Sequence, residues 1–288
     1  MLNTLLDVLL DALKDTALMI PFLFGVYILI EYMEHASSDK IVKAFKKLGP
    51  FGPVGGAVIG TVPQCGVSAA AANLYTGRVI SIGTIISVFL ATSDEAIPMI
   101  IANPAKISVL WKLISVKIVI AVLAGITVDI IFKFLNRNKT TDNDNHFHEL
   151  CENCGCEEHG ILYSALMHTV NITVFVFVIT LLLNMAIVLV GEGNIAKFMM
   201  SDSFFQPFIS ALVGFIPNCA SSVIITQLYL EDGILSFGSA IAGLCTSAGL
   251  GLLVLFKTNK KHMKKNFLIC GILYITAVLS GIIINTLG

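Results

Sequence analysis

Apolar residues run along the chain in long stretches separated by short polar connections. Eight such segments stand out, at residues 16–33, 52–75, 79–102, 109–134, 161–190, 204–230, 234–256 and 266–287. Because a helix rises about 1.5 Å per residue, each segment is long enough to cross roughly 30 Å of hydrocarbon. The pattern predicts an all-α, polytopic membrane protein, which we expect in the cytoplasmic (inner) membrane.

The composition supports this prediction. Only 13% of the 288 residues are charged, whereas ordinary soluble domains carry about 25%. So little charge cannot cover the surface of a soluble enzyme. The net charge of −1 provides no basic surface for nucleic acid, and seven cysteines are too sparse for a disulfide framework.

Two of the segments contain the same motif. Gly60-Thr-Val-Pro63-Gln64-Cys65 in the first half matches Gly214-Phe-Ile-Pro217-Asn218-Cys219 in the second. Further ordered matches pair residues 12–16 with 165–169, 74–75 with 228–229 and 91–93 with 245–247. These matches predict a duplication, with a first transmembrane repeat at 1–135, a Cys/His-rich loop at 136–160 and a second transmembrane repeat at 161–288.

The lysines indicate how the two repeats are oriented. Connections 40–47 and 257–265 are rich in lysine, but their equivalents in the other half are not, as inverted repeats predict under the positive-inside rule. If segments 52–75 and 204–230 are re-entrant hairpins, the repeats are inverted and meet at a midplane site. The lysine loops and loop 136–160 are then cytosolic and both termini lie outside. An arrangement in which every segment spans also keeps the lysine loops inside.

The repeated motif predicts broken helices with ligands at the break. Proline removes a backbone donor inside a helix, and irregular backbone at membrane depth is tolerated where it lines a polar cavity. The amides of Gln64 and Asn218 offer neutral oxygens to a cation. The thiols of Cys65 and Cys219 are either ligands for a soft ion or small buried apolar groups.

An acidic pair lies inside segment 79–102. A carboxylate at the centre of a membrane helix costs about 2.5–3.5 kcal/mol, so Asp94 and Glu95 are functional candidates. Both follow Thr92 and Ser93, which we expect to line the same site together with their repeat equivalents Thr246 and Ser247. We expect the acidic pair to bind one cation and to release it on protonation; a short surface loop is the alternative.

Three further groups of residues have ligand chemistry. Glu31, Glu34 and His35 share one helix face and suit a divalent metal, or they form a charged cap at the membrane surface. Asp15 and His168 occupy equivalent places and are metal ligands, proton relays or polar helix ends. The third group is the loop that contains His146, His148, Cys151, Cys154, Cys156 and His159. Its C-x-x-C spacing indicates cytosolic metal capture or sensing, with an unstructured acidic linker as the alternative.

Motifs for enzymatic chemistry are missing from the sequence. It contains no nucleophile triad, phosphate-binding glycine loop or Walker-type nucleotide motif. We therefore expect no enzyme activity and no cofactor, with the transported metal ion as the ligand. Transport must then draw on a gradient or a partner, and proton coupling and homo-oligomer formation stay open.

Four motifs together resemble a known family. They are the E-x-x-E-H cluster at 31–35, the GTVPQCG run at 60–66, the TSDEAIP run at 92–98 and the IPNCASS run at 216–222. The chain resembles, over nearly its whole length, the heavy-metal exporters described as ten-spanning permeases, a family linked to arsenic efflux or manganese transport. The resemblance implies metal export, with Gln64, Cys65, Asp94, Glu95, Asn218 and Cys219 at the site. Ten spans fit if each broken segment counts as two.

The ligand types favour one function over two alternatives. Hard oxygen donors outnumber sulfur at the expected centre, which favours a secondary transporter exporting a divalent cation, manganese first and iron or zinc next. A permease for trivalent arsenic or organoarsenicals using Cys65 and Cys219 is the first alternative. A non-transporting membrane metal sensor that depends on the Cys/His-rich loop is the second.

Overall fold

The computed structural model describes most of the membrane-embedded part of the chain. The described residues are 9–10, 12–13, 16–17, 20–21, 23–25, 27–28, 51–93, 96–101, 107–135, 161–190, 205–217, 219–230 and 234–287. Several predicted site residues lie outside this set, namely Asp15, Glu31, Glu34, His35, Asp94, Glu95, Asn218 and the whole loop 136–160.

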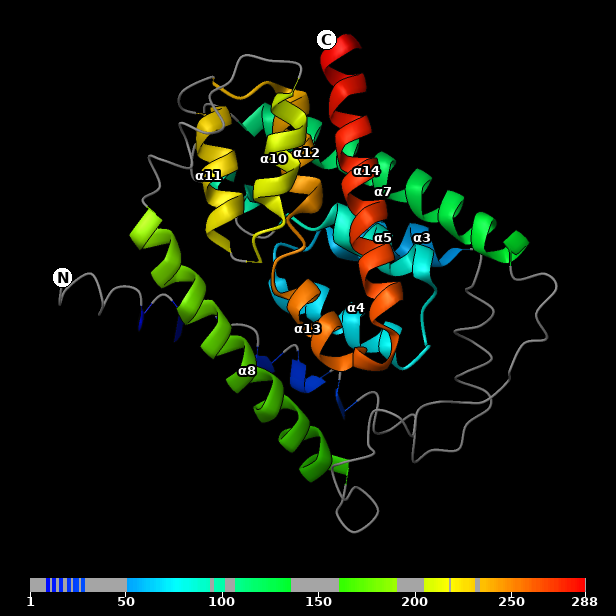
Figure 1. The fold of residues 1–288 in the computed structure, drawn as a ribbon, viewed down its shortest axis with the longest axis vertical. Helices are drawn as coiled ribbons and strands as arrows, with labels where there is room; N and C mark the ends of the chain where they lie inside the picture. The colour runs from blue at the N-terminus through cyan, green and yellow to red at the C-terminus, as the bar shows by residue number, and fades with distance from the viewer. Residues whose placement is uncertain are drawn as a thin grey trace.

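Every element in the described part is a helix, which confirms the all-α prediction (Figure 1). In chain order the α-helices are α3 (Gly52–Gly60), α4 (Cys65–Thr76), α5 (Ile82–Ala91), α6 (Ala96–Ile101), α7 (Ile107–Leu135), α8 (Ile161–Val190), α10 (Gln206–Gly214), α11 (Cys219–Leu230), α12 (Phe237–Thr246), α13 (Leu250–Thr258) and α14 (Met263–Leu287). A short 3-10 helix, Lys260–His262, precedes α14.

Four helical stretches are apolar and long enough to cross a membrane. They are Ile82–Ile101, Ile107–Leu135, Phe237–Thr258 and Lys260–Leu287. The first and third are largely buried, whereas α7 and α14 expose apolar side chains such as Trp111, Leu123 and Leu279. Exposed apolar helix faces of this length are what contact with lipid requires.

The two halves share the same order of helix lengths. Helices α3, α4 and α5 have 9, 12 and 10 residues, and α10, α11 and α12 repeat these lengths. The long helices also match, because the run AVLAGI of Ala121–Ile126 in α7 corresponds to AVLSGI of Ala277–Ile282 in α14. The duplicated motifs thus belong to duplicated local structure. The relative direction of the halves in a membrane stays a prediction.

The segment 52–75 is broken where the proline motif predicted a break. Helix α3 ends at Gly60, and α4 begins after Gln64, whose backbone is extended at φ −157° and ψ 124°. Gly60 also permits close packing, because an added Cβ would lie 2.6 Å from the carbonyl oxygen of Val88. Its counterpart Gly214 packs in the same way against the carbonyl of Gly243.

Two further segments are also broken, although the sequence indicated breaks only in segments 52–75 and 204–230. Segment 79–102 divides into α5 and α6, and segment 234–256 divides into α12 and α13. Gly249 precedes α13 with φ 54°, in the left-handed region that glycine adopts without strain. Pro98 lies in the first turn of α6, just after the first of these breaks, where it removes a hydrogen bond that a continuous helix would need; the break before α13 carries no proline.

Helices of each half pack against helices of the other half. Within each half, α5 packs on α3 and α7, and α12 packs on α10 and α14. Across the halves, α4 packs on α13, and α11 packs on α6. At the first of these contacts an added Cβ on Gly251 would lie 2.7 Å from Cβ of Ser68. The short helices α4 and α11 therefore form part of the interface between the halves, together with the contacts of α5 with α12 and α14.

Helix α8 runs along one side of the molecule (Figure 1) and contacts α13. The Nζ of Lys257 on α13 donates to the backbone oxygen of Asn171 at 2.7 Å and lies 4.4 Å from the ring centroid of Phe175. Near the start of α8, Thr169 donates to the oxygen of Ala165 at 2.7 Å. Thr16 donates in the same way to Ala12, which agrees with the predicted pairing of residues 12–16 with 165–169.

Candidate ion site at the helix breaks

Five serines of the described residues lie buried beside the helix breaks. They are Ser68, Ser93, Ser221, Ser222 and Ser247, each at most 2% exposed. The hydroxyls of Ser222 on α11 and Ser247 after α12 share a hydrogen bond. Ser68 Oγ donates to the oxygen of Cys65 at 2.9 Å. The breaks thus place hydroxyl groups inside a largely apolar helical protein.

Lys117 is the charged group at this interior. It lies on α7, and its side chain is 0% exposed. Its Nζ donates to Ser93 Oγ at 2.7 Å, to the backbone oxygen of Leu244 at 2.7 Å and to that of Thr92. An ammonium has three donors, and three oxygens accept them here. Lys117 therefore connects the break after α5 in the first half with the end of α12 in the second.

The position of these oxygens explains how a buried charge is tolerated. Removing an ammonium from water costs several kcal/mol unless hydrogen bonds and opposite charge compensate. Thr92 is the C-cap of α5, and Leu244 lies in the last turn of α12. The C-terminal end of a helix carries partial negative charge and carbonyls that lack helical partners. Two helix C-termini thus contribute to compensating the positive charge of Lys117.

The sequence prediction missed Lys117, although a signal for it exists. It stands in the apolar segment 109–134, where an ionisable residue is a functional candidate by the same rule that selects Asp94 and Glu95. Its counterpart supports this interpretation. Lys117 precedes Ala121 by four residues, and Leu273 precedes the matching Ala277 by four. Leu273 is also 0% exposed, so only one of these two equivalent interior positions carries a charge.

The predicted threonine and serine lining lies at the breaks. Thr92 Oγ1 donates to Val88 O at 2.7 Å, and Thr246 Oγ1 donates to Ala211 O at 2.7 Å. Both threonine hydroxyls therefore bind backbone within their own half. Ser93 differs, because its hydroxyl accepts from Lys117 and the acidic pair Asp94–Glu95 directly follows it in the sequence.

The proline motif places two predicted ligands at the start of α4. Gln64 is the half-buried residue before the helix, and Cys65, which is 8% exposed, is its first residue. Cys219 begins α11 at the equivalent place, whereas its side chain and Asn218 lie outside the described part. Coordination of an ion by these four residues stays a prediction.

His168 lies apart from the proline motif in the chain, on α8. Its ring stacks on Tyr27 with a centroid distance of 5.2 Å and an interplanar angle of 15°. Within the described residues, no group of three or more His, Cys, Asp or Glu side chains comes together. Metal binding by His168 and by the acidic residues outside that set stays a prediction.

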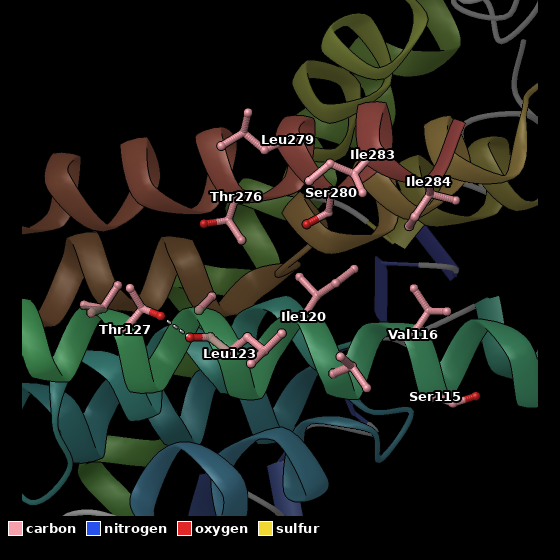
Figure 2. Close-up of a pocket in the computed structure, with 13 residues that line it drawn as sticks. Ser115, Val116, Ile120, Leu123, Thr127, Thr276, Leu279, Ser280, Ile283 and Ile284 are labelled. Carbon is pink, nitrogen blue, oxygen red and sulfur yellow. Dashed lines mark hydrogen bonds between the residues drawn. The ribbon is translucent and has the colours of Figure 1, made fainter. Parts of the chain in front are cut away.

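A large groove lies elsewhere, between α7 and α14. It measures about 780 Å³, and Figure 2 shows side chains from both helices lining it. The lining is mostly aliphatic, with hydroxyls from Ser115, Thr127, Thr276 and Ser280 and no ionisable side chain. An apolar groove without charge does not suit a metal cation. The helix breaks around Lys117 are therefore the better candidate site.

These features define a multi-pass helical membrane protein whose broken helices surround a buried, charged centre. The chain belongs to the family described as "Putative, 10TM heavy-metal exporter", whose model matches residues 2–169 and 160–288. This match confirms the resemblance seen in the sequence motifs and identifies a transporter family. No curated protein and no solved structure matches the chain.

Proposed function

We propose that this protein is a secondary transporter that exports a divalent metal cation from the cytosol, with manganese as the first candidate and iron or zinc next. The membership of a heavy-metal exporter family supports export of a metal. The observation that carries the proposal is the polar centre around Ser93, where two broken helices from different halves end beside a buried charge. Asp94 and Glu95 continue the chain from Ser93.

The charges at this centre account for the choice of a cation. Lys117 contributes one positive charge, which by itself repels a metal ion. If ionised, Asp94 and Glu95 together outnumber it, and the centre then carries a net charge of −1. Neutralising either acid removes this excess, so cation binding depends on both. Carboxylate, hydroxyl and amide oxygens are the donors that manganese prefers over soft sulfur.

The broken helices suit alternating access. We propose that the two repeats are inverted, with segments 52–75 and 204–230 as re-entrant hairpins and the site near the membrane midplane. The packing of α4 on α13 and of α11 on α6 supports this arrangement. In it, one short helix of each half packs against a helix of the other half. The lysine loops would face the cytosol, and a proton gradient is the proposed energy source.

The test is metal uptake into inverted membrane vesicles. Manganese, iron(II), zinc and arsenite are supplied separately, with and without a proton gradient. We expect gradient-dependent uptake of manganese, and loss of at least tenfold in Asp94→Asn and in Glu95→Gln. Asp129→Asn is the matched control, because Asp129 is an acid on α7 that binds backbone. Wild-type uptake by both acidic-pair variants would refute the proposed site.

A second candidate cargo is trivalent arsenic. Cys65 favours it, since its nearly buried thiol lies directly at the first break and thiolates bind soft ions. The double variant Cys65→Ser/Cys219→Ser separates the two cargoes. Arsenite transport should disappear if the cysteines are ligands, whereas manganese transport should persist.

A further inference from the structure

The ammonium of Lys117 occupies a position that has the properties of a cation site. Among the described residues, Lys117 is the charged side chain that is fully buried. Its Nζ donates to two backbone carbonyls and one hydroxyl. Carbonyl and hydroxyl oxygens are also the groups that bind alkali and ammonium ions in membrane proteins.

The acceptors come from both halves. Thr92 and Ser93 end α5, and Leu244 lies in the last turn of α12. The two helix C-termini therefore meet at one positive charge, which each of them attracts. Without that charge, partial negative charges from two helix ends would face each other in an apolar interior. The ammonium thus acts as an electrostatic link between the repeats.

We propose that Lys117 is a tethered cation that holds the two halves together at their broken helices, and that the same oxygens bind a free monovalent cation when the tether is removed. This assignment does not depend on which ion the protein carries. The repeat equivalent Leu273 is buried and apolar, so the equivalent position in the second half carries no charge.

The experiment measures the thermal stability of purified protein in detergent. The chloride salts of methylammonium, sodium and potassium are compared with choline chloride at equal ionic strength. Lys117→Ala leaves the oxygens and creates space for an ion. Leu273→Ala is the matched control. It creates space at the equivalent buried position on α14, where the second half naturally carries leucine in place of lysine.

We expect Lys117→Ala to have a lower Tm than wild type in choline. Its Tm should rise saturably, by about 5 °C, in methylammonium or one of the alkali salts. Wild type and Leu273→Ala should have the same Tm in all four salts. The proposal is overturned if the Tm of Lys117→Ala is the same in all four salts. It is also overturned if the Tm of Leu273→Ala rises by the same amount in the same salt.

Lys117→Met decides the matter if Lys117→Ala does not yield folded protein. Methionine fills most of the lysine volume but carries no charge. The proposal requires a clearly lower Tm than wild type, or no folded protein, for Lys117→Met, and wild-type-like folding for Lys117→Arg. A wild-type Tm for Lys117→Met overturns it. These measurements involve no transport, so they stand or fall separately from the proposed export of metal.

Discussion

The carboxylate of Asp129 on α7 accepts a hydrogen bond from the backbone N–H of Gly83 at 2.7 Å, at the start of α5. The same carboxylate accepts from Ser81 Oγ at 2.6 Å. In the second half, Asn285 on α14 accepts from the N–H of Gly238 at 3.0 Å. An acid and an amide therefore fulfil the same role, which is to satisfy the free N–H groups at a helix N-terminus.

This equivalence predicts the effect of substitutions at Asp129. Asp129→Asn should retain the hydrogen bond to Gly83 and change the free energy of unfolding by less than about 1 kcal/mol. Asp129→Leu should leave the start of α5 unsatisfied and cost about 1–3 kcal/mol. Thermal unfolding in detergent measures both. A smaller loss for Asp129→Leu than for Asp129→Asn would contradict the capping role.

Close helix packing predicts opposite outcomes for two glycines of α3. A Cβ on Gly60 would lie 2.6 Å from the oxygen of Val88, whereas a Cβ on Gly55 would meet nothing within 4 Å. Gly60→Ala should therefore force α3 and α5 apart and cost about 1–3 kcal/mol. Gly55→Ala should be neutral or stabilise the protein by up to about 1 kcal/mol, because alanine favours the helix. Equal Tm shifts for the two variants would disprove the packing argument.

The contacts of Lys257 predict that this side chain holds α8 against α13. Its Nζ binds the backbone of Asn171 at 2.7 Å and lies over the ring of Phe175. Lys257→Met should remove both contacts and increase backbone hydrogen exchange in α8, with little effect in α12. The exposed Lys260 provides the control, and Lys260→Met should leave α8 unchanged. Unchanged exchange in Lys257→Met would mean that apolar contacts alone fix α8.

The sequence predicted the helix breaks at the two repeated proline motifs and missed the breaks before α6 and α13. Pro63 cannot donate to a helix, and the break between α3 and α4 follows from that chemistry. The break before α13 depends on φ 54° at Gly249, and a single glycine in an apolar run is tolerated in most helices. That break depends on the contact with α4 across the repeats, which no local pattern contains.

The candidate site was also predictable only in part, because its contacts depend on packing between the two halves. Periodicity and hydropathy place Thr92, Ser93 and Thr246 in membrane segments, and the duplication relates them to one another. The link between them is Lys117, whose three acceptors lie 24, 25 and 127 residues away along the chain. Its charge was visible in the sequence, but its partners depend on how the two halves pack.

The position of the charged centre also predicts that the Cys/His-rich loop is dispensable for transport. Lys117 lies on α7, Ser93 lies in the break after α5 and Leu244 lies in the last turn of α12, so the proposed path for the ion needs no residue of loop 136–160. Replacing residues 146–159 with a glycine–serine linker of equal length should leave manganese uptake by inverted vesicles within about twofold at saturating metal. Uptake at low metal should fall if the loop captures ions. No metal uptake by the wild type, together with full loss of cellular metal tolerance in the linker variant at normal protein levels in the membrane, would instead favour the sensor hypothesis. The double variant Cys151→Ser/Cys154→Ser separates the two effects, because it removes the thiols but keeps the length and acidity of the loop.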